Sequence, residues 1–171
     1  MLEAKEIRGA TTKRRGTKSA ARADTMDSSI IHLLHRASQR ASEIFAIETR
    51  DFDLTARQYA VIATIARHEG LSQTDLVRMT GIDRSTLADV VQRLLRRGII
   101  ERERTTRDGR TYAVTLSESG RELLQSIRPI ARRADRHVLS VLSEEESRAL
   151  VNALNQLIKR SEASARNGRP Q

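Results

Sequence analysis

Cysteine is absent from this 171-residue sequence. Its absence excludes disulfides, thiolate zinc sites, cysteine nucleophiles and thiol-based redox sensing. Tryptophan is also absent, and the only aromatic residues are two tyrosines and two phenylalanines, too few to favour stacking on single-stranded bases. No apolar run approaches the roughly 18 residues that span a bilayer, and no signal-peptide segment follows the basic N-terminus. We therefore expect a soluble, cytoplasmic protein.

The patterns that usually mark an enzyme are also missing. The sequence has no nucleotide-binding glycine loop, no nucleophile with a matching base, and no paired carboxylates in a recognisable site. His32 and His35 have the i, i+3 spacing that can hold a metal on one helix face. No carboxylate or cysteine set completes such a site, so a structural role for both histidines is the stronger interpretation. We predict neither catalysis nor a metal or other cofactor.

Positive charge dominates the composition. Lysine and arginine total 31 against 22 aspartates and glutamates, which gives a formal net charge of +9. Nearly all of the basic residues are arginine, which suits bidentate contacts to phosphate and guanine. A genome whose codon usage favours arginine explains the same bias equally well. The surplus is compatible with a polyanionic partner but does not by itself establish one.

The chain begins with a basic arm, residues 1–26, followed by a long helix. Residues 1–25 hold seven basic and three acidic side chains without a sustained apolar period, as is typical of a segment that forms no packed core. An inert solvated tail is the simpler interpretation, and auxiliary DNA contact is the alternative. From residue 27 to about residue 50, apolar residues recur at helical spacing and predict a long helix. They are Ile30, Leu34, Ala37, Ala41, Ile44 and Phe45.

Three shorter helices follow, and each opens with a capping residue. Thr55, Ser72 and Asp83 each stand where a side-chain oxygen can accept a hydrogen bond from an otherwise unpaired helix amide. Gly70 and Gly81 separate these helices. Two strands with period-two alternation come next, "IIERER" and "RTYAVTL", with Tyr112, Val114 and Leu116 on one face.

Two long helices complete the chain. Ser117 caps the first of them, which Pro129 can bend. Ser143 and Glu146 form a capping box for the second. This last helix carries an apolar stripe made of Leu150, Val151, Leu154, Leu157 and Ile158. Residues 164–171 are typical of a frayed tail.

Residues 72–97 fit a helix-turn-helix whose second helix has two distinct faces. The buried side is predicted from the i, i+3, i+4, i+7 and i+8 spacing of Leu87, Val90, Val91, Leu94 and Leu95. The candidate DNA-contacting residues of this helix are Arg84, Ser85, Thr86, Asp89, Gln92, Arg93 and Arg96. Small hydroxyls allow close approach to DNA, glutamine and arginine can reach base edges, and the helix N-terminus offers amides to phosphate.

The hairpin that follows this helix has a basic tip. A helix-turn-helix followed by two strands is the element order of a winged helix, so the loop Thr105–Arg110 is predicted to lie along the minor groove, where negative potential favours arginine. Arg107 and Arg110 are the candidate contacts. Asp108 is expected to orient the neighbouring guanidinium rather than to touch DNA itself.

With these motifs in this order, the sequence resembles the MarR family of bacterial transcription regulators. The resemblance covers roughly residues 27–160 and rests on "LTARQYAVIATIA", "LSQTDLVRMTGIDRSTLADVVQRLLRRGIIERE", "RDGR" and "VTLSESGRELL". It implies a mainly α fold with a small β-hairpin wing. Residues 54–116 would form the winged helix-turn-helix, and residues 27–50 and 117–163 would supply the dimerisation helices.

The resemblance also implies a function. A homodimer would place two recognition helices in successive major grooves of double-stranded DNA and read a pseudo-palindrome. The family favours repression relieved by a small ligand, and DNA binding would bring the protein to the nucleoid. A nonspecific architectural DNA-binding protein is the alternative and an enzyme the last choice.

A ligand pocket is a further implication of the resemblance, because many members of the family bind anionic, often phenolic, compounds between the dimerisation and DNA-binding regions. The candidate residues here are Arg36, Arg40, Phe45, Phe52 and Tyr59. The alternative is that the aromatic residues belong to the core and both arginines are solvated.

Overall fold

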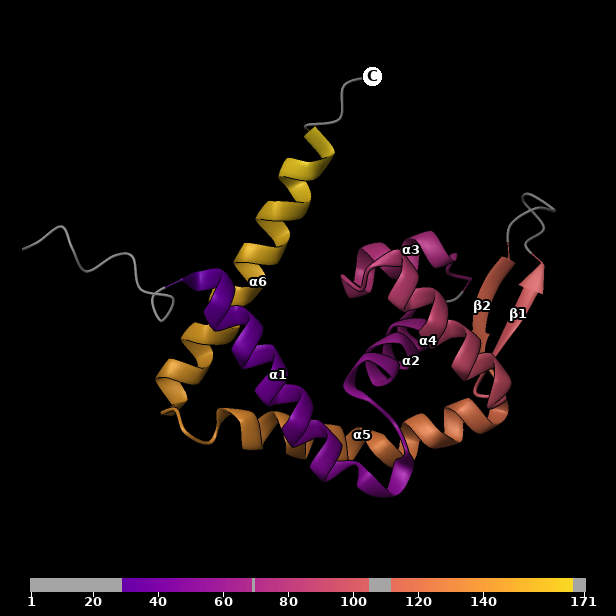
Figure 1. Ribbon diagram of the computed structural model, residues 1–171, viewed down its shortest axis with the longest axis horizontal. Helices are drawn as coiled ribbons and strands as arrows, with labels where there is room; N and C mark the ends of the chain where they lie inside the picture. The colour runs from indigo at the N-terminus through magenta and orange to yellow at the C-terminus, as the bar shows by residue number, and fades with distance from the viewer. Residues whose placement is uncertain (1–28, 69, 105–111, 168–171) are drawn as a thin grey trace, which may run out of the picture. The chain divides into compact units, whose positions relative to one another are not determined.

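The computed structural model describes residues 29–68, 70–104 and 112–167, and of these the side chains of residues 104 and 161–167 are not described. The fold is mainly α with one two-stranded antiparallel hairpin, as predicted (Figure 1). In chain order the elements are α1 (Ile30–Glu48), the 3-10 turn η2 (Arg50–Phe52), α2 (Ala56–Arg67), α3 (Gln73–Thr80), α4 (Arg84–Arg96), β1 (Ile100–Arg104), β2 (Tyr112–Leu116), α5 (Glu118–Leu139) and α6 (Glu144–Asn167).

The chain divides into two units, residues 1–37 and residues 38–171. Of the first unit, the structure describes the opening turns of α1, where Ile30 and Ile31 are exposed. The second unit contains the core and every other element. Within this unit, Figure 1 shows α2, α3, α4 and the hairpin gathered over the first half of α5, with α6 following the other end of that helix.

Capping side chains define the starts of α2 and α3. Thr55 and Gln58 exchange reciprocal hydrogen bonds at the start of α2, with N–O distances of 2.9 and 3.2 Å. Ser72 and Asp75 do the same at the start of α3. The predicted caps are confirmed at these sites, and their hydrogen bonds satisfy amides that lack an acceptor within the helix.

The core lies where α2 meets α3, α4, the hairpin and α5. Its fully buried side chains include one or more from each of these elements, namely Val61, Ile62, Leu76, Leu87, Val91, Leu94, Ile100, Val114 and Ile127. Burial of apolar surface on this scale is the main favourable term in folding. The helix-turn-helix and the first half of α5 therefore share one hydrophobic core.

The hairpin is anchored to this core at its base. Its register pairs Ile100 with Leu116 at the base and Arg104 with Tyr112 toward the tip. Val114 also donates a backbone hydrogen bond of 2.9 Å to the carbonyl of Leu71, which adds an isolated antiparallel bridge beside β2. Tyr112 shares the predicted face with Val114 and Leu116 but is 46% exposed, because it lies at the tip end of the strand, beyond the core.

Of the two long C-terminal helices, only α6 differs from the sequence-based expectation, in its length. Pro129 lies within α5, which continues as one helix from Glu118 to Leu139. The capping box of Ser143 and Glu146 is present at the start of α6. α6 extends to Asn167, four residues past the expected end at residue 163, because the sequence offers no helix breaker before Gly168.

The start of α5 is held against the turn between α4 and β1. The Ser117 hydroxyl accepts a hydrogen bond of 3.0 Å from the Gly120 amide and lies 3.0 Å from the Ile99 carbonyl oxygen, to which it can donate. The Ser119 hydroxyl donates to the Gly98 carbonyl at 2.9 Å. A Cβ atom at position 120 would lie 2.0 Å from the Ile99 carbonyl oxygen. Glycine is therefore required here by the close approach of two backbones.

We expect Gly120→Ala to destabilise the protein. Alanine is a better helix former by about 1 kcal/mol, but the clash with backbone outweighs this gain, and we expect a net loss of about 1–3 kcal/mol in the free energy of unfolding. Urea denaturation measures it. The control is Glu122→Ala on the exposed side of the same helix, expected to change stability by less than about 0.5 kcal/mol. Wild-type stability in Gly120→Ala would contradict the close approach.

Candidate nucleic-acid interface

The helix-turn-helix is built from α3 and α4 around a short turn. Gly81 ends α3 in the left-handed conformation, with φ of 68°, and donates a hydrogen bond of 3.0 Å to the Val77 carbonyl. The Ile82 amide donates to the Thr80 hydroxyl at 3.3 Å, and the Ile82 side chain packs against the core. Turn geometry and packing together set the direction in which α4 leaves α3.

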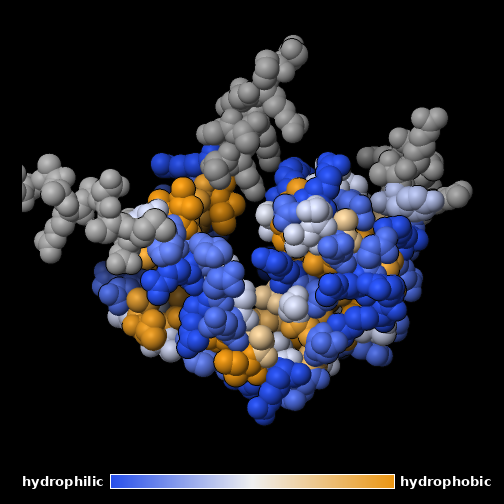
Figure 2. Space-filling model, viewed as in Figure 1, coloured by the Kyte–Doolittle hydropathy of each residue, from blue (hydrophilic) through white to orange (hydrophobic). Residues whose placement is uncertain are grey.

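The two predicted faces of α4 are confirmed by its burial. Leu87, Val90, Val91 and Leu94 are buried, and Leu95 is partly buried. The seven predicted contact residues of this helix lie away from the core. Six of them are exposed and Thr86 is half-buried. Figure 2 shows the outer surface of α4 as hydrophilic. An exposed polar face backed by a rigid apolar one can enter a DNA groove without disturbing the core.

Three arginines give this face its positive charge. Arg84 lies in the first turn of α4, and Arg93 and Arg96 lie in its last turn. No side chain in the described part of the chain forms a salt bridge with any of the three. Their guanidinium groups are therefore available to phosphate or to base edges. Asp89 lies on the same exposed face, where a carboxylate can accept a hydrogen bond from cytosine.

Asp83 sets the start of α4. Its carboxylate accepts hydrogen bonds from the Thr86 amide at 2.9 Å and from the Ser85 hydroxyl at 2.7 Å. These two bonds, the amide bond first, hold the pKa of Asp83 well below its ordinary value of 3.8. The Ser85 hydroxyl is thus oriented toward the cap. The remaining amides of the first turn have no acceptor within the helix and can bind a phosphate.

The lowered pKa makes the contribution of Asp83 depend on pH. A group whose pKa is lower in the folded protein contributes stability above its unfolded pKa and loses it as pH falls through the folded pKa. We expect wild type to be more stable than Asp83→Asn at neutral pH, and the difference to shrink below pH 3.8. Asparagine keeps the cap acceptor but not the charge, so urea unfolding of both proteins across pH isolates the charge. A difference independent of pH would contradict this account.

The predicted wing contacts, Arg107, Asp108 and Arg110, lie outside the described residues. Their roles stay predictions. What the structure describes is the base of the hairpin, held by β pairing, by the bridge to Leu71 and by the contacts at Ser117. These contacts anchor the strands that lead to the tip.

Arg97 is a positioning residue that the sequence did not reveal. It follows α4 directly, and its two terminal nitrogens donate to the Asp53 carbonyl at 2.6 Å and to the Phe52 carbonyl at 3.3 Å. Asp53 has a positive φ of 44°, so the guanidinium holds an unusual backbone conformation in place. The contact ties the end of α4 to the connection between η2 and α2. More than 40 residues separate Arg97 from its two partners. The only signal in the sequence is the pair Arg96-Arg97, because helical periodicity turns Arg97 away from the exposed face of α4 that carries Arg96.

Only two of the five predicted ligand-binding residues line a common recess. Phe45 and Tyr59 meet with ring centroids 5.4 Å apart and line a recess of about 290 Å³ between α1, α2 and α5, together with Ala131, Ala134 and Asp135 among others. Phe45 is buried and Tyr59 is half-buried. The two rings therefore serve both the core and the wall of this recess, which we call the aromatic recess.

The other three residues do not line the aromatic recess. Phe52 is half-buried and packs against the core. Arg40 is exposed and forms a 3.0 Å salt bridge with Glu43, and Arg36 is exposed on α1. Asp135 is instead the charged side chain in the wall, which favours a hydroxyl or N–H donor at that point of the recess.

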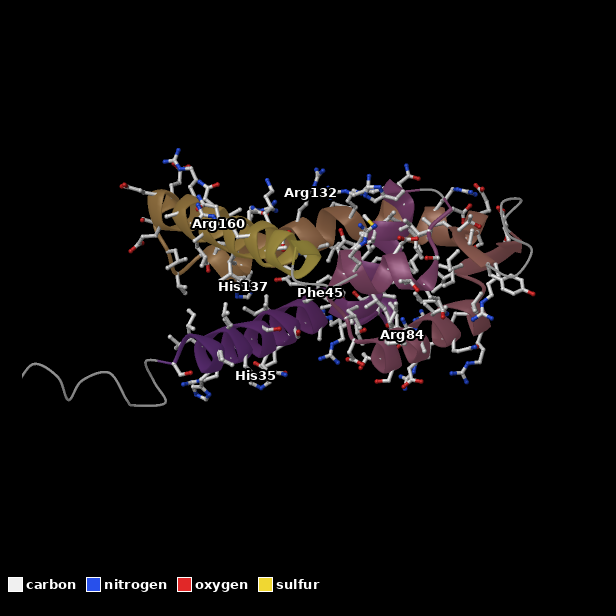
Figure 3. The ribbon with its side chains drawn as sticks, turned by 90° about the horizontal axis from the view of Figure 1, so that it is seen from above. His35, Phe45, Arg84, Arg132, His137 and Arg160 are labelled. Atoms are coloured by element: carbon white, nitrogen blue, oxygen red, sulfur yellow. The ribbon has the colours of Figure 1, made fainter. Side chains whose placement is uncertain are left out.

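No group of three or more metal-ligating side chains occurs within the described residues. His32 and His35 lie on α1, where Figure 3 labels His35. As far as the chain is described, no helix is long and apolar enough to cross a membrane.

A connection between α1 and α5 lies beside the aromatic recess. Glu48 at the end of α1 accepts hydrogen bonds from Arg133 at 2.5 Å and from the Nδ1 side of His137 at 3.2 Å. The hydrogen bond from Arg133, followed by that from His137, lowers the pKa of Glu48 below its ordinary value. These two hydrogen bonds connect the end of α1 to α5 beside this recess.

Comparison with known proteins identifies the family. A family model described as MarR family matches residues 52–111. The HTH-type transcriptional repressor NicR of Pseudomonas putida is 31% identical to this chain over 131 residues, covering 77% of this chain and 83% of NicR. The chain belongs to the MarR family. It is a transcriptional regulator of that family, and the resemblance seen in its motifs is confirmed.

Solved structures of regulators have the same fold. A probable transcriptional regulator from Pseudomonas aeruginosa is 34% identical, with a TM-score of 0.72 over 78% of this MarR-family chain and 99% of its own. BpsR of Bordetella bronchiseptica is 30% identical, with a TM-score of 0.73 over 78% of this chain and 96% of its own, in a structure concerned with regulation of its DNA binding by 6-hydroxynicotinic acid. These relatives are regulators rather than enzymes, consistent with the expectation from the sequence.

Proposed function

We propose that this MarR-family chain is a homodimeric, sequence-specific repressor that binds a pseudo-palindromic operator in double-stranded DNA and is released by a small aromatic ligand. The observation that carries the proposal is the exposed face of α4. Gln92 and Arg96 on this face can hydrogen-bond base edges, while Arg84 and Arg93 can neutralise phosphates. The wing arginines 107 and 110 would add minor-groove contacts.

Apolar surface on the long helices supports the homodimer. Leu150, Val151, Leu154 and Leu157 on α6 are each 37–52% exposed, and Ile47 on α1 is 60% exposed. Figure 2 shows hydrophobic residues gathered over α6. A large contiguous patch of exposed apolar surface marks an interaction site. A second copy of the chain is the occupant that gives two recognition helices a two-fold relation.

The aromatic recess is the proposed site of the effector. Its rings, Phe45 and Tyr59, can pack against a planar ligand, and Asp135 can accept a hydrogen bond from a ring hydroxyl or N–H. The recess touches α1, α2 and α5, so a ligand that fits one arrangement of these helices better than another would shift the DNA-binding equilibrium. BpsR, whose DNA binding is regulated by a hydroxylated aromatic acid, supports this ligand class.

A footprint on the DNA upstream of the protein's own gene tests the proposal. We expect two protected major-groove segments with centres about 10–10.5 base pairs apart, or a multiple of that spacing, and a dimer in sedimentation velocity. 6-Hydroxynicotinic acid is the first effector to try, and its expected result is loss of the footprint. A monomer that leaves no discrete footprint would overturn the operator and the dimer together.

The alternative, a nonspecific architectural DNA-binding protein, uses the same fold and charge. An architectural protein would protect the whole DNA fragment without discrete segments, and any competitor DNA would remove this protection. The reason is that phosphate contacts carry no sequence information. Adding excess random-sequence duplex to the footprinting reaction separates the two functions. A repressor keeps its protected segments, whereas an architectural protein loses them.

A further inference from the structure

Arg97 lies at the junction between α4 and the hairpin. It follows the last residue of α4, and β1 begins three residues later at Ile100. Its two terminal guanidinium nitrogens donate to two successive backbone carbonyls, that of Asp53 at 2.6 Å and that of Phe52 at 3.3 Å. The planar guanidinium presents its donors in a fixed fork, so this bidentate contact sets both the distance and the direction between the two segments.

The two acceptor carbonyls belong to a segment that is itself held in place. Thr49, which precedes η2, is 1% exposed. Its hydroxyl donates to the Phe45 carbonyl at 2.7 Å and lies 3.3 Å from the Leu54 carbonyl oxygen. The Leu54 side chain is buried in the core. The connection between α1 and α2 therefore provides a fixed base for the Arg97 guanidinium.

The same junction is attached to the start of α5. The Gly98 carbonyl oxygen lies 2.5 Å from the Ser117 hydroxyl and accepts a hydrogen bond of 2.9 Å from the Ser119 hydroxyl. Arg97 thus stands between two attachments, one through its own side chain and one through the carbonyl of the next residue. Loss of the Arg97 side chain would leave the second attachment and the core packing of α4 intact. We therefore expect the end of α4 to shift rather than the protein to unfold.

We propose that Arg97 determines sequence specificity without touching DNA, by fixing the direction of α4. The inference rests on the proposed reading of an operator by Gln92 and Arg96, which lie in the second half of α4. A bidentate contact to a base edge requires close placement of the side chain that makes it. Phosphate contacts carry no sequence information and form on any duplex. A shift of the end of α4 therefore costs discrimination between sequences more than it costs binding to DNA in general.

Fluorescence anisotropy of the full chain on operator and random-sequence duplexes, over a range of salt concentrations, tests this role. Arg97→Gln removes both hydrogen bonds and is expected to lower the ratio of operator to random-DNA affinity about tenfold or more. Its affinity for random DNA and the salt dependence of that affinity are expected to match wild type, because a residue that binds no phosphate releases no counterion. Thermal unfolding of each variant verifies that it is folded at the temperature of the titration.

Three control variants isolate the contact. Asp53→Asn removes a carboxylate whose oxygen lies 3.8 Å from Arg97 but keeps both carbonyls and tolerates a positive φ, so the wild-type ratio is expected. Arg97→Lys keeps the charge without the planar fork and is expected to recover only part of the ratio. Arg148→Gln removes an exposed arginine from α6 and is expected to leave both affinities at the wild-type level.

Other results would overturn this role for Arg97. A salt slope on random DNA that is smaller by about one in Arg97→Gln would make Arg97 a phosphate contact. Full recovery of the ratio by Arg97→Lys, or an equal loss in Asp53→Asn, would attribute the effect to charge. An unchanged ratio in Arg97→Gln would leave Arg97 a structural role only. A wild-type ratio near one would instead overturn the proposed operator recognition and this inference with it, so the two failures are distinguishable.

Discussion

Leu154→Glu/Leu157→Glu is expected to yield a folded monomer whose affinity for the operator is lower by about 100-fold or more. Both leucines lie on the exposed apolar face of α6, so charge there opposes burial against a second copy without entering the core. A dimer binds its second half-site at a high effective concentration, and separation of the subunits loses that gain of about 10²–10⁴. Sedimentation velocity and fluorescence anisotropy on operator DNA measure the two effects.

The control for this variant introduces the same charges on the opposite side of α6. Asn152→Glu/Gln156→Glu changes two exposed polar residues that lie about half a turn away from Leu154. It is expected to remain dimeric and to bind the operator within a few-fold of wild type. Should both variants dissociate equally, net charge rather than the apolar face would control assembly. A dimeric Leu154→Glu/Leu157→Glu would contradict the proposed interface.

Gln92→Ala and Arg96→Ala are each expected to relax sequence specificity. A bidentate contact to a base edge contributes about 1–3 kcal/mol of discrimination, equivalent to roughly 5- to 150-fold in operator affinity. Affinity for random-sequence DNA should fall much less, since these residues are assigned to bases rather than phosphates. Anisotropy titrations on both duplexes at one salt concentration give the two affinities and their ratio.

Two further variants separate base reading from charge. Arg110→Ala, in the predicted wing, is expected to weaken binding to operator and random DNA alike and to reduce the dependence on salt. Arg148→Ala on α6 removes an exposed arginine from a different helix and is expected to change neither affinity beyond a few-fold. If Gln92→Ala and Arg96→Ala, like Arg110→Ala and Arg148→Ala, change the affinities for operator and random DNA by the same factor, α4 does not read the base sequence.

Local sequence patterns predicted much of this fold because local physics governs the features concerned. The caps at Thr55, Ser72 and Asp83 depend on a side chain and an amide three residues away, which spacing alone reveals. The buried and exposed faces of α4 depend on helical periodicity, and the observed burial agrees with the prediction. These two features also define the part of the candidate interface that the structure describes.

Features that depend on long-range contact were not predictable in the same way. Arg97 has carbonyl partners 44 and 45 residues earlier in the chain, and no pattern in one sequence specifies such a pair. Gly120 resembles any helical glycine until the Ile99 carbonyl is placed against it. The aromatic cluster was expected as one site, yet only Phe45 and Tyr59 share the aromatic recess. Phe52, in the turn η2, packs against the core without lining the recess.

A groove of about 880 Å³ between the end of α2, the base of the hairpin and α5 was equally unpredictable from the sequence. Arg121, Arg128 and Arg132 form a regular stripe in the sequence, which by itself is typical of a solvated helix face. Only the packing of α5 against the end of α2 and the base of the hairpin places an apolar floor beside them. Periodicity specifies which side chains share a face, whereas tertiary packing decides whether that face is a surface or the wall of a site.

The ratio of operator affinity to random-DNA affinity, measured for the wild-type protein at physiological salt, tests the central claim most directly. Specific reading by two copies of α4 predicts a ratio of about 10³ or more. It also predicts that Gln92→Ala and Arg96→Ala each lower the ratio. A wild-type ratio near one, unchanged in both variants, would contradict the claim and leave only binding to the phosphate backbone.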